Sequence, residues 1–110
     1  MDKDLLLKHA TNAKYKDKKD SQKFLLSITH LSLDNKNIEV IECLELCPNL
    51  TTLYLFENRI FRISGLERLT KLTQLSLYDN RIARMEGFEA LVNLKRLYLE
   101  KNCISRLEGL

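Results

Sequence analysis

The chain of 110 residues has few of the residues on which enzyme sites depend. It contains two histidines and three glycines. The histidines, His9 and His30, lie in different predicted elements, and no carboxylate pair or nucleophile–base pair accompanies them. The glycines are isolated from one another, which excludes a glycine-rich phosphate loop. The sequence therefore predicts a protein that is not an enzyme and uses no cofactor.

The cysteines and the apolar residues exclude other classes of protein. Cys43, Cys47 and Cys103 show no paired framework such as secreted repeat proteins use, and the first two lack a second ligand pair for zinc. No apolar run approaches the roughly 18 residues of a transmembrane helix, and the charged first residues are unlike a signal peptide. We therefore expect a cytoplasmic protein with no membrane contact and no metal site.

One pattern, L-x-x-L-x-L-x-x-N-x-I-x-x-I, occurs four times in this chain. The copies begin at Ile28, Leu50, Leu72 and Leu94, so each starts 22 residues after the one before. A fixed period indicates a solenoid of stacked units, which offers an extended binding surface rather than a catalytic cleft. We assign residues 1–26 to an N-terminal helical cap with a lysine-rich loop. Residues 27–110 form four repeats, the last of them incomplete.

The spacing of apolar residues predicts the shape of each repeat. The Leu-x-Leu alternation is typical of a short strand, and the later spacing of three is typical of a helical or 3-10 turn. The sequence therefore predicts an α/β solenoid with a short parallel concave sheet and 3-10 or helical convex segments. Gly65, Gly87 and Gly109 share one column, which Cys43 occupies in the first repeat. That column is expected to need a small residue or unusual backbone angles.

Asparagine recurs where each predicted strand ends, at Asn58, Asn80 and Asn102. A buried carboxamide can both donate and accept hydrogen bonds, so we expect it to satisfy backbone groups that leave the sheet there. Lys36 stands in this column in the first repeat and cannot accept. We interpret Lys36 as an edge residue whose ammonium reaches water, and a functional lysine is the alternative.

The first 26 residues carry the whole excess of positive charge. They contain seven Lys and four Asp, a balance of +3, whereas residues 27–110 contain eleven basic and eleven acidic residues. The lysine-rich loop is either solvated or attracted to an acidic partner such as a tubulin tail or RNA. Ser21 is expected to cap a helical turn. Leu5, Leu6, His9 and Ala13 are expected on one side of a first short helix, and the turn after Ser21 is expected to carry Phe24, Leu25 and Ile28, the last of which begins the first repeat.

The repeats resemble a known class of protein. The second, third and fourth copies read LTTLYLFENRIFRISGLERL, LTQLSLYDNRIARMEGFEAL and LKRLYLEKNCISRLEGL. They are similar to the leucine-rich repeats of the regulatory subunits of protein phosphatase 1, the leucine-rich light chain of axonemal dynein and the spliceosomal A-prime protein. The resemblance covers residues 27–110 and implies a leucine-rich repeat fold.

A second resemblance lies at the front of the repeats. The run SITHLSLDNKNIEVIECLELCPNL (27–50) is similar to the first repeat of the protein phosphatase 1 regulatory subunit 42 family, the testis leucine-rich repeat proteins. This resemblance implies a location at the cytoskeleton, centrosome or cilium. The partners that it implies are the catalytic subunit of protein phosphatase 1, tubulin or an axonemal protein. The chain has no basic-Val/Ile-x-Phe/Trp motif, so phosphatase binding would have to use the repeat surface.

The concave face of the predicted sheet carries the candidate binding residues. Aromatic side chains occupy outward positions of neighbouring strands, with acidic residues beside them, and tyrosines in such a patch are favoured anchors for protein partners. Strand propensity and cross-strand packing would also place aromatics here. The predicted protein-binding residues are Tyr54, Phe56, Glu57, Tyr78, Asp79, Arg96, Tyr98 and Glu100.

A stripe of arginines follows the asparagine column, at Arg59, Arg62, Arg81, Arg84 and Arg106. Glutamates in neighbouring columns indicate a solvated surface of mixed charge, and the aromatic side chains lie on the other face, so nucleic acid is not the expected partner. The predicted function is a non-enzymatic protein-interaction scaffold of the cytoskeletal, ciliary or phosphatase-regulatory type. The alternative is a ribonucleoprotein component of the spliceosomal A-prime type.

The fourth copy of the pattern stops at Leu110, before the column that Leu69 and Leu91 occupy. Solenoids need a terminal unit with a polar outer side. We therefore expect the C-terminal edge to be continued by further repeats or covered by a partner.

Overall fold

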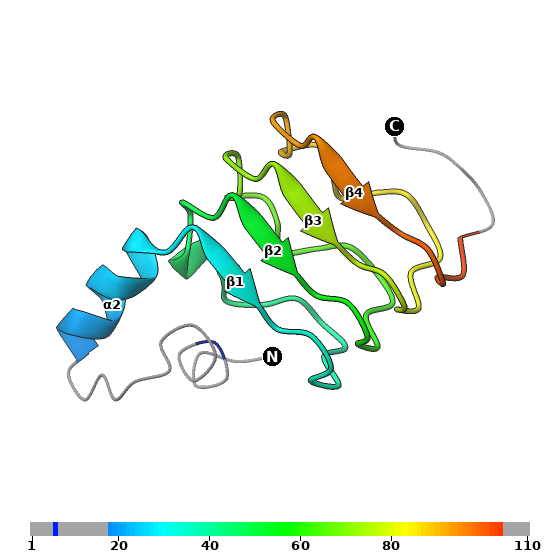
Figure 1. The fold of residues 1–110 in the computed structure, drawn as a ribbon, viewed down its shortest axis with the longest axis horizontal. Helices are drawn as coiled ribbons and strands as arrows, with labels where there is room; N and C mark the ends of the chain where they lie inside the picture. The colour runs from blue at the N-terminus through cyan, green and yellow to red at the C-terminus, as the bar shows by residue number, and fades with distance from the viewer. Residues whose placement is uncertain (1–5, 7–17, 105–110) are drawn as a thin grey trace.

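The structure, a computed structural model, describes Leu6 and residues 18–104. Helix α2 (Lys18–Ser27) leads into four strands, β1 (His30–Ser32), β2 (Thr52–Tyr54), β3 (Gln74–Ser76) and β4 (Arg96–Tyr98). The strands are parallel and follow one another across an open sheet in chain order. The convex segments that run from the end of one strand back to the start of the next are called return segments here. Figure 1 shows them behind this sheet and shows α2 at the end beside β1. The predicted fold class, a repeat solenoid with a parallel sheet, is confirmed.

The sequence period sets the pairing register of the sheet. Each residue pairs with the one 22 positions later, as in the row Leu31, Leu53, Leu75 and Leu97. The outward rows are His30, Thr52, Gln74, Arg96 and Ser32, Tyr54, Ser76, Tyr98. A shift of one residue would turn every leucine toward solvent, so the alternation excludes that register.

The convex side is less helical than the spacing predicts. In the described residues, a 3-10 helix, η1 (Leu44–Leu46), occurs only in the first repeat. Two consecutive turn bonds define it, from Leu46 N to Cys43 O and from Cys47 N to Leu44 O. In the second repeat the turn bonds are separated, from Leu69 N to Leu66 O and from Leu72 N to Leu69 O. Isolated turns of this kind follow the same apolar spacing without forming a helix.

The core runs through all the described repeats and continues into the N-terminal segment. The columns of leucine and isoleucine are buried, and Leu6 and Leu25 pack with them. Helix α2 begins at Lys18, so the prediction that Ser21 caps it is wrong, because Ser21 lies inside the helix. The predicted cap residues Leu5, His9 and Ala13 lie outside the described residues.

The asparagine column forms a ladder of hydrogen bonds between repeats. Asn80 is 6% exposed, and its Oδ1 accepts from Ile60 N at 3.0 Å. Its Nδ2 donates to Leu55 O and Leu77 O, both at 3.0 Å. Asn102 bonds Ile82, Leu77 and Leu99 in the same way. The predicted burial and backbone bonding of Asn80 are confirmed, and each asparagine also reaches back to the preceding repeat.

This backward reach explains why Lys36 can replace asparagine. Asn58 Oδ1 accepts from Lys36 N at 2.9 Å and Ile38 N at 3.1 Å, and Asn58 Nδ2 donates to Leu33 O at 3.0 Å. The first repeat is therefore satisfied by the asparagine of the second. Helix α2, and not another repeat, precedes the first repeat. A carboxamide at position 36 would therefore have no preceding repeat whose backbone groups it could bond. The Lys36 side chain is exposed, as expected for an edge residue.

The glycine column is explained by positive φ angles and by a close approach between repeats. Gly65 and Gly87 have φ of 76° and 86°. A Cβ atom on Gly65 would lie 2.5 Å from the carbonyl oxygen of Ile41 in the preceding repeat, and one on Gly87 would lie 2.5 Å from that of Ile63. Cys43, directly before η1, also has a positive φ, 66°, but its repeat is preceded by helix α2 and not by another repeat. Gly109 lies outside the described residues.

Side-chain hydrogen bonds from threonine and from Asn49 also join neighbouring units, and neither kind was anticipated from the sequence. Thr51 Oγ1 donates to Thr29 O at 3.2 Å, and Thr73 Oγ1 donates to Thr51 O at 3.1 Å. Asn49 Nδ2 donates to Leu26 O in the last turn of α2. Because the final carbonyls of a helix have no partner within it, Asn49 fastens the helix to the end of the first repeat.

The last strand is less covered than the others. Leu94, Leu97, Leu99 and Ile104 are only partly buried. The expectation that further repeats or a partner cover this edge stays a prediction, and its remaining residues, Leu107 and Leu110, lie outside the described part of the chain. No helix among the described residues is long and apolar enough to cross a lipid bilayer.

We predict that Asn80→Ala lowers the free energy of unfolding by about 1–3 kcal/mol, because it leaves buried backbone groups in two repeats without partners. Asn93→Ala is the matched control, since Asn93 is exposed and makes one bond, to Thr70 O at 2.8 Å. Urea unfolding of both variants measures the difference. Equal effects would show that the buried ladder contributes no more than a surface hydrogen bond.

Gly65→Ala is expected to destabilise the chain by at least about 2 kcal/mol, because it combines a positive φ with contact against a carbonyl. Cys43→Ala is the control, because that position has a similar φ without a preceding repeat coil. We expect the control to change stability by less than about 1 kcal/mol. Thermal unfolding compares the two. A tolerated alanine at position 65 would mean that the repeats do not approach as closely as described.

Candidate protein-binding face

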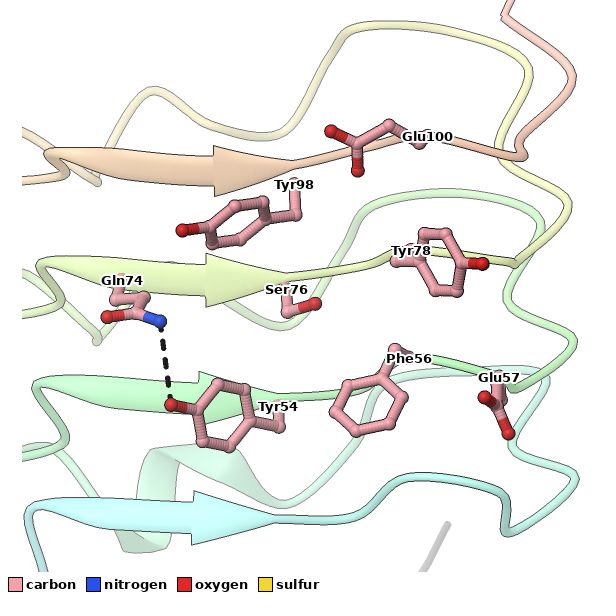
Figure 2. Close-up of a pocket in the computed structure, with 8 residues that line it drawn as sticks. All are labelled: Tyr54, Phe56, Glu57, Gln74, Ser76, Tyr78, Tyr98 and Glu100. Carbon is pink, nitrogen blue, oxygen red and sulfur yellow. Dashed lines mark hydrogen bonds between the residues drawn. The ribbon is translucent and has the colours of Figure 1, made fainter.

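The concave face contains a hollow of about 350 Å³ across the last three strands. Figure 2 shows aromatic side chains from three successive repeats around it. The residues that line it are Tyr54, Phe56, Glu57, Gln74, Ser76, Tyr78, Tyr98 and Glu100. Because no other described element covers this face of the sheet, the side chains form an open surface that a second molecule can reach (Figure 1).

The hollow exists because one position in an outward row is small. Ser76 pairs with Tyr54 on one side and Tyr98 on the other. Adjacent strands lie about 4.8 Å apart, so the two tyrosines flank a gap about two strand spacings wide. Ser76 is 7% exposed although it points away from the core. The neighbouring side chains therefore form the walls, and the serine forms part of the floor.

The aromatic side chains are held by contacts with one another and with the sheet. The rings of Tyr54 and Phe56 meet edge to face, with centroids 6.0 Å apart. Gln74 Nε2 donates to the Tyr54 hydroxyl at 3.4 Å (Figure 2). Sheet bonds continue beyond the strands, from Asn35 N to Phe56 O and from Glu57 N to Tyr78 O. The backbone that carries the walls is therefore fixed by neighbouring repeats.

A column of positive φ angles borders the hollow where the strands end. Asn35, Glu57, Asp79 and Lys101 have φ of 54°, 57°, 58° and 58°. Asparagine and aspartate adopt this conformation more readily than glutamate or lysine. The Lys101 ammonium lies 5.5 Å from the centroid of the Tyr78 ring. Hydrogen bonding and then charge interaction with Tyr78, followed by the charge of Asp79, raise the pKa of Lys101 above its ordinary value.

The structure brings six of the eight sequence-predicted residues to this hollow. They are Tyr54, Phe56, Glu57, Tyr78, Tyr98 and Glu100. Asp79 and Arg96 are not in the lining, although each stands one period after a residue that is, Asp79 after Glu57 and Arg96 after Gln74. Gln74 and Ser76 were missed, because a search for anchors selects large side chains and overlooks a small residue between two of them. A partner at these residues stays a prediction.

A second hollow, of about 330 Å³, lies on the return side of the middle repeats, away from the concave face. Phe61, Arg62, Ala83, Arg84 and Glu86 line it. Arg59 and Arg81 are exposed nearby, and Phe61 is 49% exposed. The described members of the predicted arginine stripe therefore lie on this surface. The exposed ring of Phe61 beside them was not expected from the sequence. Arg106 lies outside the described residues.

The cysteines differ sharply in their surroundings. Cys47 is fully buried, and Cys103 is exposed. Burial is the main cause that raises the pKa of Cys47 to about 12, with Glu45 and Cys43 adding to it. A protonated thiol is a poor nucleophile, so Cys47 has a structural role. Among the described residues, no three metal-ligating side chains gather closely enough to hold an ion.

We predict that iodoacetamide modifies Cys103 and leaves Cys47 unmodified in the folded chain at pH 8. The raised pKa keeps the Cys47 thiol protonated at this pH, and burial blocks access to it. Peptide mass spectrometry after timed alkylation measures both sites. In urea, where burial is lost, the two are expected to react at similar rates. Fast modification of Cys47 under native conditions would show that the first repeat opens readily.

Comparisons with known proteins agree with this architecture. Residues 70–110 match the family model for leucine-rich repeats in two copies. The chain is similar to an internalin from Listeria monocytogenes, with a TM-score of 0.69 and 36% identity over 77% of this chain and 25% of that chain. It is also similar to a chain of the SNF/U2A′ complex of Drosophila melanogaster, with a TM-score of 0.52 and 27% identity. That match covers 69% of this chain and 60% of the other. The chain thus spans a quarter of the length of the internalin and less than two thirds of the length of the second protein. Together with the parallel sheet, these similarities show that the chain has the leucine-rich repeat fold.

Proposed function

We propose that this chain is a non-enzymatic interaction module that binds a protein partner on its concave face. The aromatic hollow carries the proposal, because four aromatic side chains gather on a face that no described element covers. The leucine-rich repeat fold of this chain supports the proposal, because leucine-rich repeat proteins generally mediate protein–protein interactions. Tyrosines with an apolar ring and a polar hydroxyl are well suited to such a surface.

The resemblance at the front of the repeats supports a narrower proposal. It suggests a partner at the cytoskeleton, centrosome or cilium, or the catalytic subunit of protein phosphatase 1, in the cytoplasm. Tubulin and an axonemal protein are the other candidates. If the phosphatase is the partner, it contacts the repeat surface, since the chain has no basic-Val/Ile-x-Phe/Trp motif.

A ribonucleoprotein role is the second candidate, and one observation favours it. The chain is similar in fold to a chain of the SNF/U2A′ complex, at 27% identity. The arginines near the second hollow would be the RNA contacts in this case. RNA binding through them would weaken steeply as salt increases, because phosphate contacts release counterions. Protein capture on the aromatic face would tolerate salt better, so titration with salt separates the two functions.

The main test compares paired variants on the two surfaces, using partner retrieved from extract and then purified. Tyr54→Ala with Tyr78→Ala is expected to weaken binding by about 2 kcal/mol or more, the range of interface hot spots. Arg62→Ala with Arg84→Ala is expected to matter less. Both tyrosines are half-buried, so circular dichroism and thermal unfolding must confirm that the pair still folds.

Ser76→Phe provides a second variant that adds atoms instead of removing them. It fills the gap between Tyr54 and Tyr98 from the solvent side, so we expect folding to persist while partner binding is lost. Isothermal titration calorimetry measures the affinity. Loss of binding in the arginine pair, with normal binding in both concave-face variants, would place the partner on the return side instead.

A further inference from the structure

The chemistry of the hollow is selective for charge. Its lining combines four aromatic rings with the carboxylates of Glu57 and Glu100, and no basic side chain lines it. The negative face of an aromatic ring attracts a cation, and nearby carboxylates add to this attraction. Arg96 is not in the lining, but it pairs with Gln74 at the edge of the hollow, so the side chains that line the hollow are negative or neutral while a positive charge lies beside them.

Within the chain itself, the cationic side chain of Lys101 already contacts an aromatic ring of the hollow. Its ammonium lies 5.5 Å from the centre of the Tyr78 ring. The negative charges of Asp79 and Glu57 also act on it. Lys101 is fully exposed and extends from a loop, so water competes with the contact and a partner can displace it. A cation from another molecule would find the same aromatic surface together with the carboxylates of the hollow.

We propose that the hollow receives a lysine or arginine side chain of the protein partner, and that Lys101 competes with it for Tyr78. The proposal rests on the proposed function, since it specifies what binds on the concave face. The partner segment therefore carries a basic residue with apolar neighbours, which pack on Phe56 and the tyrosines.

Other occupants fit the same surface less well. An acidic side chain would be repelled by Glu57 and Glu100 at short range. A purely apolar side chain would remove water from those carboxylates without replacing the lost hydrogen bonds, which is costly. A basic side chain avoids both penalties, because its apolar stem covers the rings while its charged end meets the carboxylates.

Random peptides displayed on phage and selected on the whole chain serve as the probe. Only peptides that fail to bind the Tyr54→Ala, Tyr78→Ala variant are kept, so that every probe uses the concave face. Each kept peptide is then made with its arginine replaced by citrulline, or its lysine by norleucine. These replacements remove the charge and keep the shape. We expect the dissociation constant to rise about tenfold.

Variants of the chain test the same contact from the other side. Glu57→Gln with Glu100→Gln should weaken binding by a similar factor. Glu42→Gln with Glu89→Gln makes the same change in net charge on other exposed surfaces and should leave it unchanged. Lys101→Met should tighten binding by about twofold to tenfold, because it removes the competing cation. Lys95→Met, with the same charge change before β4, is the matched control.

The outcomes separate this inference from the proposed function. Kept peptides that lack a basic residue, or that tolerate citrulline or norleucine, would overturn the inference while leaving concave-face binding in place. Weaker binding to Lys101→Met than to the original chain would show that Lys101 helps the partner and does not compete with it. If every selected peptide binds the tyrosine variant normally, the concave face is not the binding surface, and both proposals fail.

Discussion

Every repeat in this chain depends on a carboxamide that bonds the backbone of two coils at once. Where a strand ends, the chain turns into the core, and its N–H and C=O groups lose their sheet partners. Asn58, Asn80 and Asn102 supply both an acceptor and donors at that point, and each spans its own repeat and the one before it. Unpaired polar groups inside a core are costly, so no apolar side chain of similar size could replace these asparagines.

The asparagine ladder stabilises the repeats and also determines how they are aligned with one another. When the coils are joined at the same point in every unit, residues one period apart face each other across the sheet. The close approach at Gly65 and Gly87 requires the same alignment on the return side. Outward positions on the concave face are thereby brought into rows without contributing to the core. Their chemistry can vary without changing the fold, which is why the candidate site lies there.

Much of this architecture could be predicted from the period and the apolar columns. The strand register, the buried asparagines and the unusual backbone of the glycine column all follow from them. The 3-10 turns could not be predicted well, since identical apolar spacing gives consecutive turn bonds near Leu44 and separate ones near Leu66. The threonine bonds were missed because Thr29, Thr51 and Thr73 stand directly before strands, where β propensity is an ordinary explanation for threonine. The start of α2 was misplaced because Ser21 is a good capping residue that the helix does not use as one.

The candidate site was predictable in its anchors but not in its shape. Large aromatic side chains are visible in the sequence, whereas a hollow depends on what is missing between them, here at Ser76. The positions that depart from the repeat are therefore the informative ones. Lys36 and Cys43 mark the first repeat, where no coil precedes. Lys101 is different, because a repeat does precede it and its ammonium lies against the Tyr78 ring, at a positive φ that it shares with Glu57. No requirement of the fold accounts for a lysine there, so its explanation has to be sought on the concave face.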